Sequence, residues 1–185
     1  MAHVCPWWIG YLLASPLRRL WHNPPRILGP LVRDGDLAVE IGPGMGFFTL
    51  DLARLVGERG RVVAVDVQPR MLAKLEDRAR KAGLADRIDA RLAAPGDFGT
   101  SDLHGRAALV LAFAVVHELP DVAAFFAEAA RLLAPRGRGL FAEPTGHVTV
   151  PRFEASLALA AEAGLRVVER PAIRSCHAAI LGRAD

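Results

Sequence analysis

The stretch VEIGPGMGFFTL, from Val39 to Leu50, decides the fold. It joins an apolar run to an expected helix through a turn that holds Gly42, Gly44 and Gly46. Glycine lets the backbone adopt conformations that are closed to other residues, and it lets a ligand approach the main chain closely. A turn of this kind between a strand and a helix is typical of sites for nucleotide-like cofactors. The residues around the turn indicate whether the ligand is a dinucleotide or a smaller molecule of different charge.

The spacing of the glycines disfavours a dinucleotide. The dinucleotide fingerprint is G-x-G-x-x-G, which here would need its third glycine at position 47. That residue is Phe47, and the third glycine comes one position earlier, at Gly46. An acid, Glu40, stands two residues before the first glycine. A carboxylate at this point would repel a pyrophosphate, whereas it suits a ligand that carries an ammonium and a sulfonium group.

Short apolar runs alternate with helical patterns along the chain. The runs are nearly continuous, as in strands that are buried on both faces of a parallel sheet. The expected strands are Leu37–Ile41, Arg61–Val65, Ile88–Leu92, Ala107–Phe113 and Gly139–Ala142. The expected helices are Phe47–Val56, Pro69–Ala82, Val122–Leu133 and Pro151–Ala163. The alternation predicts right-handed crossovers and an open, doubly wound sheet with helices on both sides.

The last part of the chain predicts two further strands, Leu165–Glu169 and Ser175–Leu181. Their link, ERPAIR, is too short for a crossover helix, so the two strands should pair antiparallel. The expected fold class is therefore α/β, with a mostly parallel, doubly wound, seven-stranded sheet that ends in an antiparallel hairpin.

Residues 1–34 differ from the domain expected at residues 35–185. They hold all three tryptophans and the only tyrosine, at Trp7, Trp8, Trp21 and Tyr11. We expect one or two short helices here, which cap the cofactor edge and roof a hydrophobic or planar acceptor. Two alternatives stay open: plain packing on the sheet, and weak contact with a membrane surface, where Trp and the pair Arg18–Arg19 are common.

Composition excludes several classes of protein. The chain has 185 residues, of which 52% are hydrophobic, and a formal net charge of +3, which fits one compact domain. Its arginines are scattered, so no nucleic-acid partner is expected. Cys5 and Cys176 make no disulfide framework, no apolar run reaches 18 residues, and the start lacks the pattern of a secretory signal. A cytoplasmic protein is expected.

A second acid completes the glycine pattern. The run RVVAVD ends at Asp66, about 20 residues beyond the glycines, where a carboxylate is placed to meet ribose hydroxyls. With strand, E-x-G-x-G-x-G, helix, strand and terminal Asp in this order, residues 35–182 resemble the class I S-adenosylmethionine-dependent methyltransferases. Within that class they look most like the type-11 group of small-molecule enzymes, which includes quinone C-methyltransferases and arsenite methyltransferases.

The resemblance implies a Rossmann-like methyltransferase fold, S-adenosyl-L-methionine as cofactor and S-adenosyl-L-homocysteine as product. The residues it implies for cofactor binding are Glu40, Gly42, Gly44 and Gly46 around the methionine and ribose, Asp66 at the ribose hydroxyls, Val67 against adenine, Leu92 and Ala93 at the adenine edge, and Ala112 and Phe113 beside the methionine. Two positions depart from the family. Ala107 stands where the fourth strand often begins with Asp, and the run after the third strand has no polar side chain before Asp97.

Candidate catalytic residues lie in two expected loops. Methyl transfer from a sulfonium needs alignment and exclusion of water, and it needs a general base only where the acceptor loses a proton. His117 follows the fourth expected strand and His147 follows the fifth. The resemblance implies that histidines such as His117 lie near the acceptor pocket, and a plain structural role is the alternative for both. His3 with Cys5, and Cys176 with His177, form too weak a pattern for a metal site, so no metal is expected.

These observations favour a methyltransferase that acts on a small, partly apolar acceptor, whose nucleophilic atom the sequence does not specify. A nicotinamide-dependent oxidoreductase is the first alternative. It is disfavoured by the glycine register, by Glu40 and by the missing Tyr-x-x-x-Lys, since Tyr11 is followed by Ser15. A cofactor-binding protein without turnover is the second alternative, because no catalytic constellation is plain.

Overall fold

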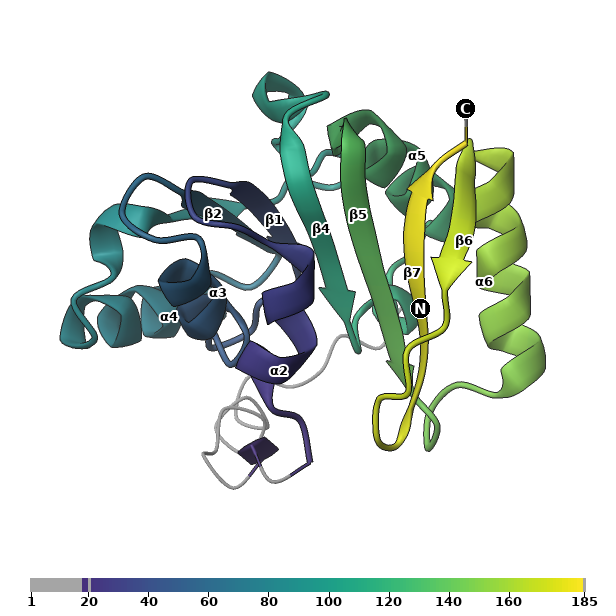
Figure 1. The fold of residues 1–185 in the computed structure, drawn as a ribbon, viewed down its shortest axis with the longest axis horizontal. Helices are drawn as coiled ribbons and strands as arrows, with labels where there is room; N and C mark the ends of the chain where they lie inside the picture. Colours follow the sequence, from purple (N-terminus) through teal and green to yellow (C-terminus); the bar gives the residue numbers. More distant parts are fainter. Residues whose placement is uncertain (1–17, 20, 185) are drawn as a thin grey trace.

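Figure 1 shows a computed structural model of the protein, which describes residues 18–19 and 21–184. Over these residues the chain forms one seven-stranded sheet in the order β3-β2-β1-β4-β5-β7-β6. The strands are β1 (Leu37–Ile41), β2 (Arg61–Asp66), β3 (Ile88–Leu92), β4 (Ala107–Phe113), β5 (Leu133–Pro144), β6 (Leu165–Glu169) and β7 (Cys176–Arg183). Neighbouring strands from β3 to β5 pair parallel, while β7 pairs antiparallel with both β5 and β6.

Helices cover both faces of the sheet (Figure 1). The α-helices are α2 (Pro24–Leu28), α3 (Thr49–Leu55), α4 (Pro69–Lys81), α5 (Val122–Leu132) and α6 (Val150–Glu162), and the short 3-10 helices are η2 (Gly29–Leu31), η3 (Ala85–Arg87), η4 (Ser101–Leu103) and η5 (Val116–Glu118). The first three α-helices pack on one face, where Leu28, Leu52 and Leu75 share a core. The other two pack on the opposite face through Phe126 and Leu157.

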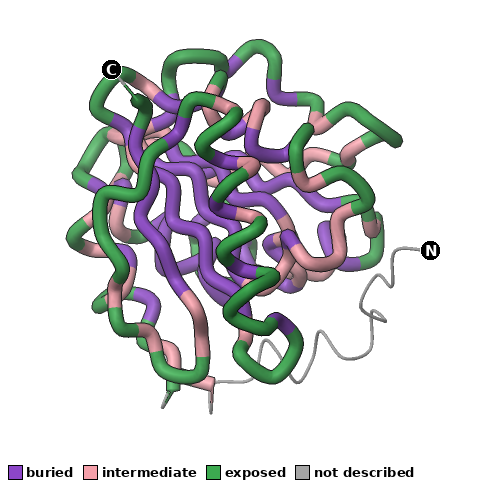
Figure 2. The backbone as a smooth tube through the Cα atoms, turned by 90° about the vertical axis from the view of Figure 1, so that its right-hand side faces the viewer, coloured by how far each residue is buried: buried purple, intermediate pink, exposed green. Residues whose placement is uncertain are grey.

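The strands supply side chains to both cores because successive residues point to opposite faces. In β2, Val62 and Ala64 belong to one core, and Val63 and Val65 belong to the other. Figure 2 shows the consequence: buried residues follow the strands through the middle of the molecule. This two-sided burial explains why the strands read as continuous apolar runs rather than alternating ones.

The expected fold class is confirmed, including the antiparallel pairing at the end of the sheet. The main difference lies in β5, which begins at Leu133 rather than Gly139. Leu133 pairs with Ala107, and the register then shifts so that Leu109 pairs with Arg138. The polar residues inside this irregular start interrupt the apolar run, so the sequence pattern places the strand too late.

The expected cap lies mostly outside the described residues. His3, Cys5, Trp7, Trp8 and Tyr11 belong to that part of the chain. Of residues 1–34, the structure describes α2 and η2 with the segment before them, and the capping role stays a prediction. In the part that is described, no helix is both long enough and apolar enough to cross a membrane.

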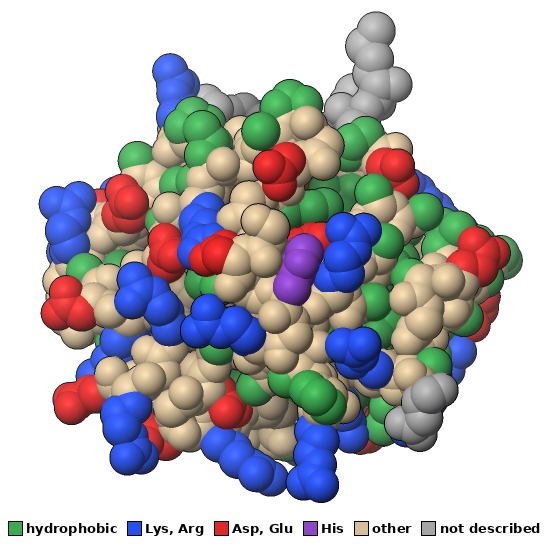
Figure 3. Space-filling model, turned by 90° about the horizontal axis from the view of Figure 1, so that it is seen from above, with side chains coloured by type: hydrophobic (Ala, Val, Ile, Leu, Met, Phe, Trp, Pro, Cys, Tyr) green, Lys and Arg blue, Asp and Glu red, His purple; other side chains and the backbone are tan. Residues whose placement is uncertain are grey.

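The amino ends of the parallel strands form the face shown in Figure 3, which is the edge opposite the pocket described below. Lysine and arginine side chains are spread over this face, and acidic side chains lie between them (Figure 3). The mixture of both charges is typical of a solvated surface.

Candidate cofactor site

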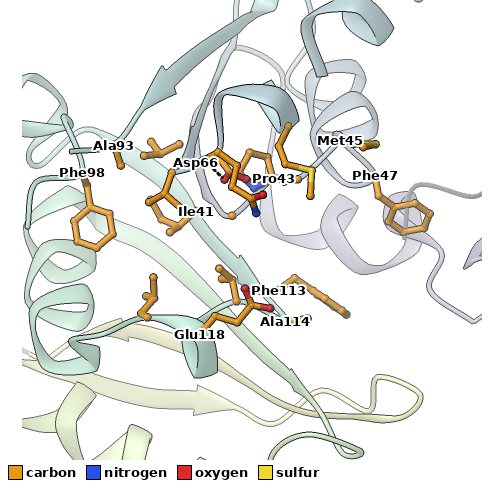
Figure 4. A pocket seen from close by; sticks show the side chains of 18 of the residues that line it. Ile41, Pro43, Met45, Phe47, Asp66, Ala93, Phe98, Phe113, Ala114 and Glu118 are labelled. Carbon is orange, nitrogen blue, oxygen red and sulfur yellow. Dashed lines mark hydrogen bonds between the residues drawn. The ribbon is translucent and has the colours of Figure 1, made fainter. Parts of the chain in front are cut away.

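A pocket of about 380 Å³ lies at the carboxyl ends of β1, β2 and β4 (Figure 4). Its walls come from residues 41–45 at the end of β1, 65–68 at the end of β2, and 113–115 and 118–120 at and after the end of β4, together with single residues from other segments. The chain leaves β1 toward β2 on one side and β4 lies on the other, so this is the switch point of the sheet. Ligands of doubly wound sheets bind at such a point.

The glycine turn shapes the pocket through two different glycines. Gly42 has φ +72°, and a Cβ there would lie 2.8 Å from Cβ of Val115, so the turn and the loop after β4 touch only because a side chain is missing. Gly44 has φ +54°, and a Cβ there would meet no protein atom within 4 Å. Gly44 therefore leaves room for a ligand beside the main chain, whereas Gly42 leaves room for Val115.

Asp66 connects the end of β2 to the glycine turn. Its Oδ2 accepts a hydrogen bond from Gly44 N at 3.2 Å, and its Oδ1 accepts one from Gln68 N at 2.9 Å. The residue is 8% exposed and forms part of the pocket wall. Burial raises the pKa of Asp66, while the hydrogen bonds from Gln68 and Gly44 act in the opposite direction. The two hydrogen bonds thus hold the carboxylate in a defined position in the pocket wall.

Glu40 lies beneath the turn and is not part of the pocket wall. It is 3% exposed, and Thr49 Oγ1 donates a hydrogen bond to its Oε2 at 2.6 Å. Burial raises the pKa of Glu40 to about 7, although Thr49 and the positive charge of Arg18 lower it. Glu40 can therefore act on a ligand in the pocket through its charge, and this charge is lost in mildly acidic solution.

Arg18 enters the pocket wall from the segment before α2. Its guanidinium carbon lies 4.5 Å from the ring centre of Phe47, 5.5 Å from that of Phe48 and 5.6 Å from that of Phe113. Burial lowers the pKa of Arg18, and Glu40 counteracts this effect. Sequence reasoning missed this residue as part of the site, because Arg18 precedes the glycine turn by more than 20 residues and no motif contains it.

The structure brings together most of the expected cofactor residues, though not all of them. Those that line the pocket are Gly42, Gly44, Asp66, Val67, Ala93 and Phe113, and those outside its wall are Glu40, Gly46, Leu92 and Ala112. Leu92 is 58% exposed and Ala112 is fully inside the core at 1%. Sequence reasoning also missed Phe98, Met71 and Leu119, which line the pocket from segments without a recognisable motif.

The two candidate catalytic histidines lie side by side, His117 in η5 after β4 and His147 in the loop after β5. The ring centres of His117 and His147 are 5.7 Å apart, and neither residue is part of the pocket wall, although Glu118 is. Nδ1 of His117 pairs with Glu143 Oε2, and this pair raises the pKa of His117. Oε1 of Glu143 accepts a hydrogen bond from Val116 N at 2.8 Å. Glu143 thus fixes both the loop and the ring of His117.

Two other sequence features lie away from the pocket. Trp21 is 49% exposed and lies beneath the guanidinium of Arg174 in a separate hollow, so it does not roof the cofactor pocket. Cys176 Sγ lies 3.7 Å from Nε2 of His22, and burial raises the pKa of Cys176 to about 11. Among the described residues, no group of three or more His, Cys, Asp or Glu side chains is placed to hold a metal ion.

Comparison with known proteins identifies the family. Residues 38–137, more than half of the chain, match the family model described as a methyltransferase domain. The chain therefore belongs to this family, within the class I S-adenosylmethionine-dependent methyltransferases, and S-adenosylmethionine is the cofactor of that class. The expected family and cofactor are confirmed.

Individual relatives differ in what their names say they modify. The chain is 35% identical to a ribosomal protein L11 methyltransferase from Pelotomaculum thermopropionicum over 72% of this chain and 42% of the relative. It is 30% identical to an arsenite methyltransferase from Halobacterium salinarum over 56% of this chain and 26% of the relative. The chain thus spans less than half the length of either protein.

Solved structures agree on the fold. A methyltransferase from Aquifex aeolicus described as SAM-dependent superposes with a TM-score of 0.85, at 21% identity, over 96% of this chain and 98% of that one. A SAM-dependent O-methyltransferase from Thermotoga maritima gives a TM-score of 0.68, at 19% identity, over 88% of this chain and 65% of that one.

Proposed function

We propose that the protein transfers a methyl group from S-adenosylmethionine to a small, partly apolar acceptor and releases S-adenosylhomocysteine. The observation that carries this proposal is the pocket at the switch point, where an open glycine, a fixed carboxylate and apolar walls meet. Gly44 gives the ligand access to the main chain, and Asp66 provides acceptors for two ribose hydroxyls. Val67 and Ala93 offer apolar contacts for adenine, and Phe113 does the same for the methionine chain.

In the proposed reaction the protein acts mainly by alignment. When bound, S-adenosylmethionine supplies a methyl carbon that an acceptor lone pair attacks in line with the breaking carbon–sulfur bond. The side chains of Phe113, Leu119 and Pro120 line the pocket and exclude water from the line of attack. The apolar wall near these residues is what favours a partly apolar acceptor.

A proton acceptor is needed only where the nucleophilic atom carries a proton. We propose His117 as the first candidate and His147 as the second, because His117 lies in η5 next to the pocket residue Glu118, and the ring of His147 lies beside that of His117. Glu143 holds Nδ1 of His117, which orients the ring and strengthens Nε2 as a base. This is the arrangement in which a carboxylate supports a histidine in proton transfer.

Side-by-side titration of S-adenosylmethionine and NADH tests the cofactor, with isothermal calorimetry as the readout. Tighter binding of S-adenosylmethionine supports the proposal, and tighter binding of NADH would favour the nicotinamide-dependent alternative. Formation of S-adenosylhomocysteine is then followed over a panel of small acceptors. Cofactor binding with no turnover on any acceptor or cell extract would favour a cofactor-binding protein without activity.

The class of acceptor has its own test, since the relatives include enzymes named for ribosomal protein and for arsenite. Cell extract is incubated with the protein and methyl-labelled S-adenosylmethionine and then separated into small molecules, protein and RNA. Label in the small-molecule fraction that an organic solvent extracts supports the proposal. Label that stays with protein or RNA would contradict it.

A further inference from the structure

Near Phe47 a partly buried cation, Arg18, lines the pocket, and a buried acid, Glu40, lies beneath its glycine turn. In Figure 4 the labelled rings of Phe47 and Phe98 lie at opposite sides of the pocket, with Asp66 between them. The guanidinium of Arg18 stands over Phe47 and beside Phe113, so it belongs to the side away from Phe98. If Asp66 holds the ribose, this side receives whatever the ribose carries at its 5′ position.

The surroundings of Arg18 hold its guanidinium in a defined orientation. Three aromatic rings surround the cation, and Nε donates to Nδ1 of His22 at 3.4 Å. His22 is itself fixed, because its Nε2 lies 3.0 Å from the carbonyl oxygen of Arg174. A guanidinium held through Nε presents its two terminal nitrogens in the plane that matches a carboxylate.

The opposite charge near Arg18 is that of Glu40. Glu40 is buried beneath residues 42–46, and its charge and that of Arg18 influence each other. An α-amino acid carries an ammonium and a carboxylate on one carbon, so it is matched by an acid and a guanidinium placed in this way. Adenine and ribose carry no anionic group with which Arg18 could pair.

We infer that Arg18 binds the α-carboxylate of the amino-acid end of the ligand, so that the pocket recognises an adenosyl amino acid rather than adenosine alone. This inference rests on the proposed function. It gives the segment before α2 a role in binding, although that segment lies outside the range that matches the family.

The experiment compares two ligands that differ only in the amino-acid part. S-adenosylhomocysteine carries it, and 5′-methylthioadenosine has the same nucleoside and sulfur without it. In Arg18→Met, which keeps an unbranched apolar chain against the rings, we expect the affinity for S-adenosylhomocysteine to fall about 10- to 100-fold. The affinity for methylthioadenosine should change less than about twofold, because its groups do not reach Arg18.

Arg19→Met is the matched control. Arg19 is the next residue, pairs with Asp51 and is not part of the pocket wall, so both ligands should bind this variant as they bind the wild type. Arg18→Lys, which retains the charge, should recover part of the lost affinity for S-adenosylhomocysteine alone. Equal losses for both ligands in Arg18→Met, or no loss for either, would overturn the inference.

A ligand variant tests the same contact without changing the protein. The wild type should bind the carboxyl methyl ester of S-adenosylhomocysteine about 10- to 100-fold more weakly than the free acid. Equal affinity for ester and acid would overturn the inference even where Arg18→Met does not fold. Failure of the wild type to bind S-adenosylhomocysteine at all would instead overturn the proposed function, so the two failures are distinguishable.

Discussion

Glu40 combines two properties that oppose each other. Its carboxylate is buried beneath the glycine turn, where the loss of hydration destabilises the charged form. The same low-polarity surroundings strengthen its attraction for a cation in the pocket. A neutral side chain at this position would be more stable, so the acid agrees with the role in cofactor binding that we propose for Glu40.

Glu40→Gln separates these two properties. The amide still accepts a hydrogen bond from Thr49 and carries no charge, so binding of S-adenosylmethionine above pH 7 should weaken by about 1–3 kcal/mol. Calorimetric titration measures this change. In the wild type, affinity should fall as the pH drops below the pKa of about 7, and the variant should lose this dependence. An unchanged affinity at every pH would show that Glu40 does not act on the ligand.

Glu40→Gln should weaken cofactor binding, but it should increase the stability of the ligand-free protein. The folded-state pKa of Glu40 lies above its ordinary value of 4.5, so the folded protein favours the protonated form. The protonated Glu40 side chain does not destabilise the fold below pH 4.5. The folded protein loses stability as the pH rises from 4.5 through about 7, because the buried side chain then becomes charged. Without ligand, Glu40→Gln should therefore melt at a higher temperature than the wild type at pH 8 and at the same temperature below pH 4.5, as circular dichroism would show.

On the proposed function, Asp66→Ala should weaken cofactor binding by about 1–3 kcal/mol, because the ribose hydroxyls would lose a charged acceptor. Equilibrium titration measures the change, and unfolding without ligand shows how much comes from the lost contacts with Gly44 and Gln68. Asp86→Ala is the control, since Asp86 is exposed in η3 and lies outside the pocket wall. Equal affinities of Asp66→Ala and the control would remove Asp66 from the site.

Alanine at Gly44 and at Gly42 should have different effects. At Gly44 the new methyl group would contact no protein atom and would extend into the pocket. Stability should fall only by the backbone strain of about 1–2 kcal/mol, whereas cofactor binding should be blocked. At Gly42 it also collides with Val115, so stability should fall further. Chemical unfolding and cofactor titration of both variants test this difference. A Gly44→Ala protein that binds normally would show that the ligand does not approach the turn.

At the scale of elements, the end of β5 determines where the loop after β4 lies. Glu143, near the carboxyl end of β5, accepts hydrogen bonds from the main chain of Val116 and His117 in η5. The neighbours of these residues, Val115 and Glu118, line the pocket. One buried carboxylate thus connects two parallel strands at their carboxyl ends and shapes the pocket wall between them.

This contact predicts a pH dependence of stability. The pair with Glu143 raises the pKa of His117 above its ordinary value of 6.5. The pair of His117 and Glu143 therefore stabilises the fold fully below pH 6.5, and this stabilisation is lost as the pH rises through the raised pKa of His117. His117→Gln should flatten the fall in melting temperature between pH 6 and pH 9, which differential scanning calorimetry can follow. If wild type and variant lose stability in parallel, the pair contributes nothing.

At the scale of the whole molecule, the sheet could be predicted more completely than the pocket. Strands buried on both faces have continuous apolar sequences, such as Ala107–Phe113, and the ends of such a run indicate where the strand begins and ends. The glycine turn and Asp66 are close in sequence to the strands that carry them, so a local motif finds them. Arg18 and Phe98 reach the pocket from distant segments, and their positions depend on packing that no local pattern records.

The position of the Glu40 side chain could not be predicted in full from the sequence. The pattern E-x-G-x-G-x-G predicts an acid at the end of β1, and the structure places it there. The alternation of side chains along β1 does not say whether that acid forms the pocket wall or lies beneath it. The answer depends on Thr49 in α3, which draws the carboxylate under the turn.

The placement of β7 between β5 and β6 constrains how the chain assembles during its synthesis. Both neighbours leave the ribosome before β7 does, and in the complete sheet β7 separates them. Until Ala178 to Leu181 emerge, the growing chain exposes an open strand edge and the apolar faces that these residues later cover. At that stage β1, β2 and β4, which carry the pocket, are already complete, so the chain should be most prone to aggregate late in its synthesis.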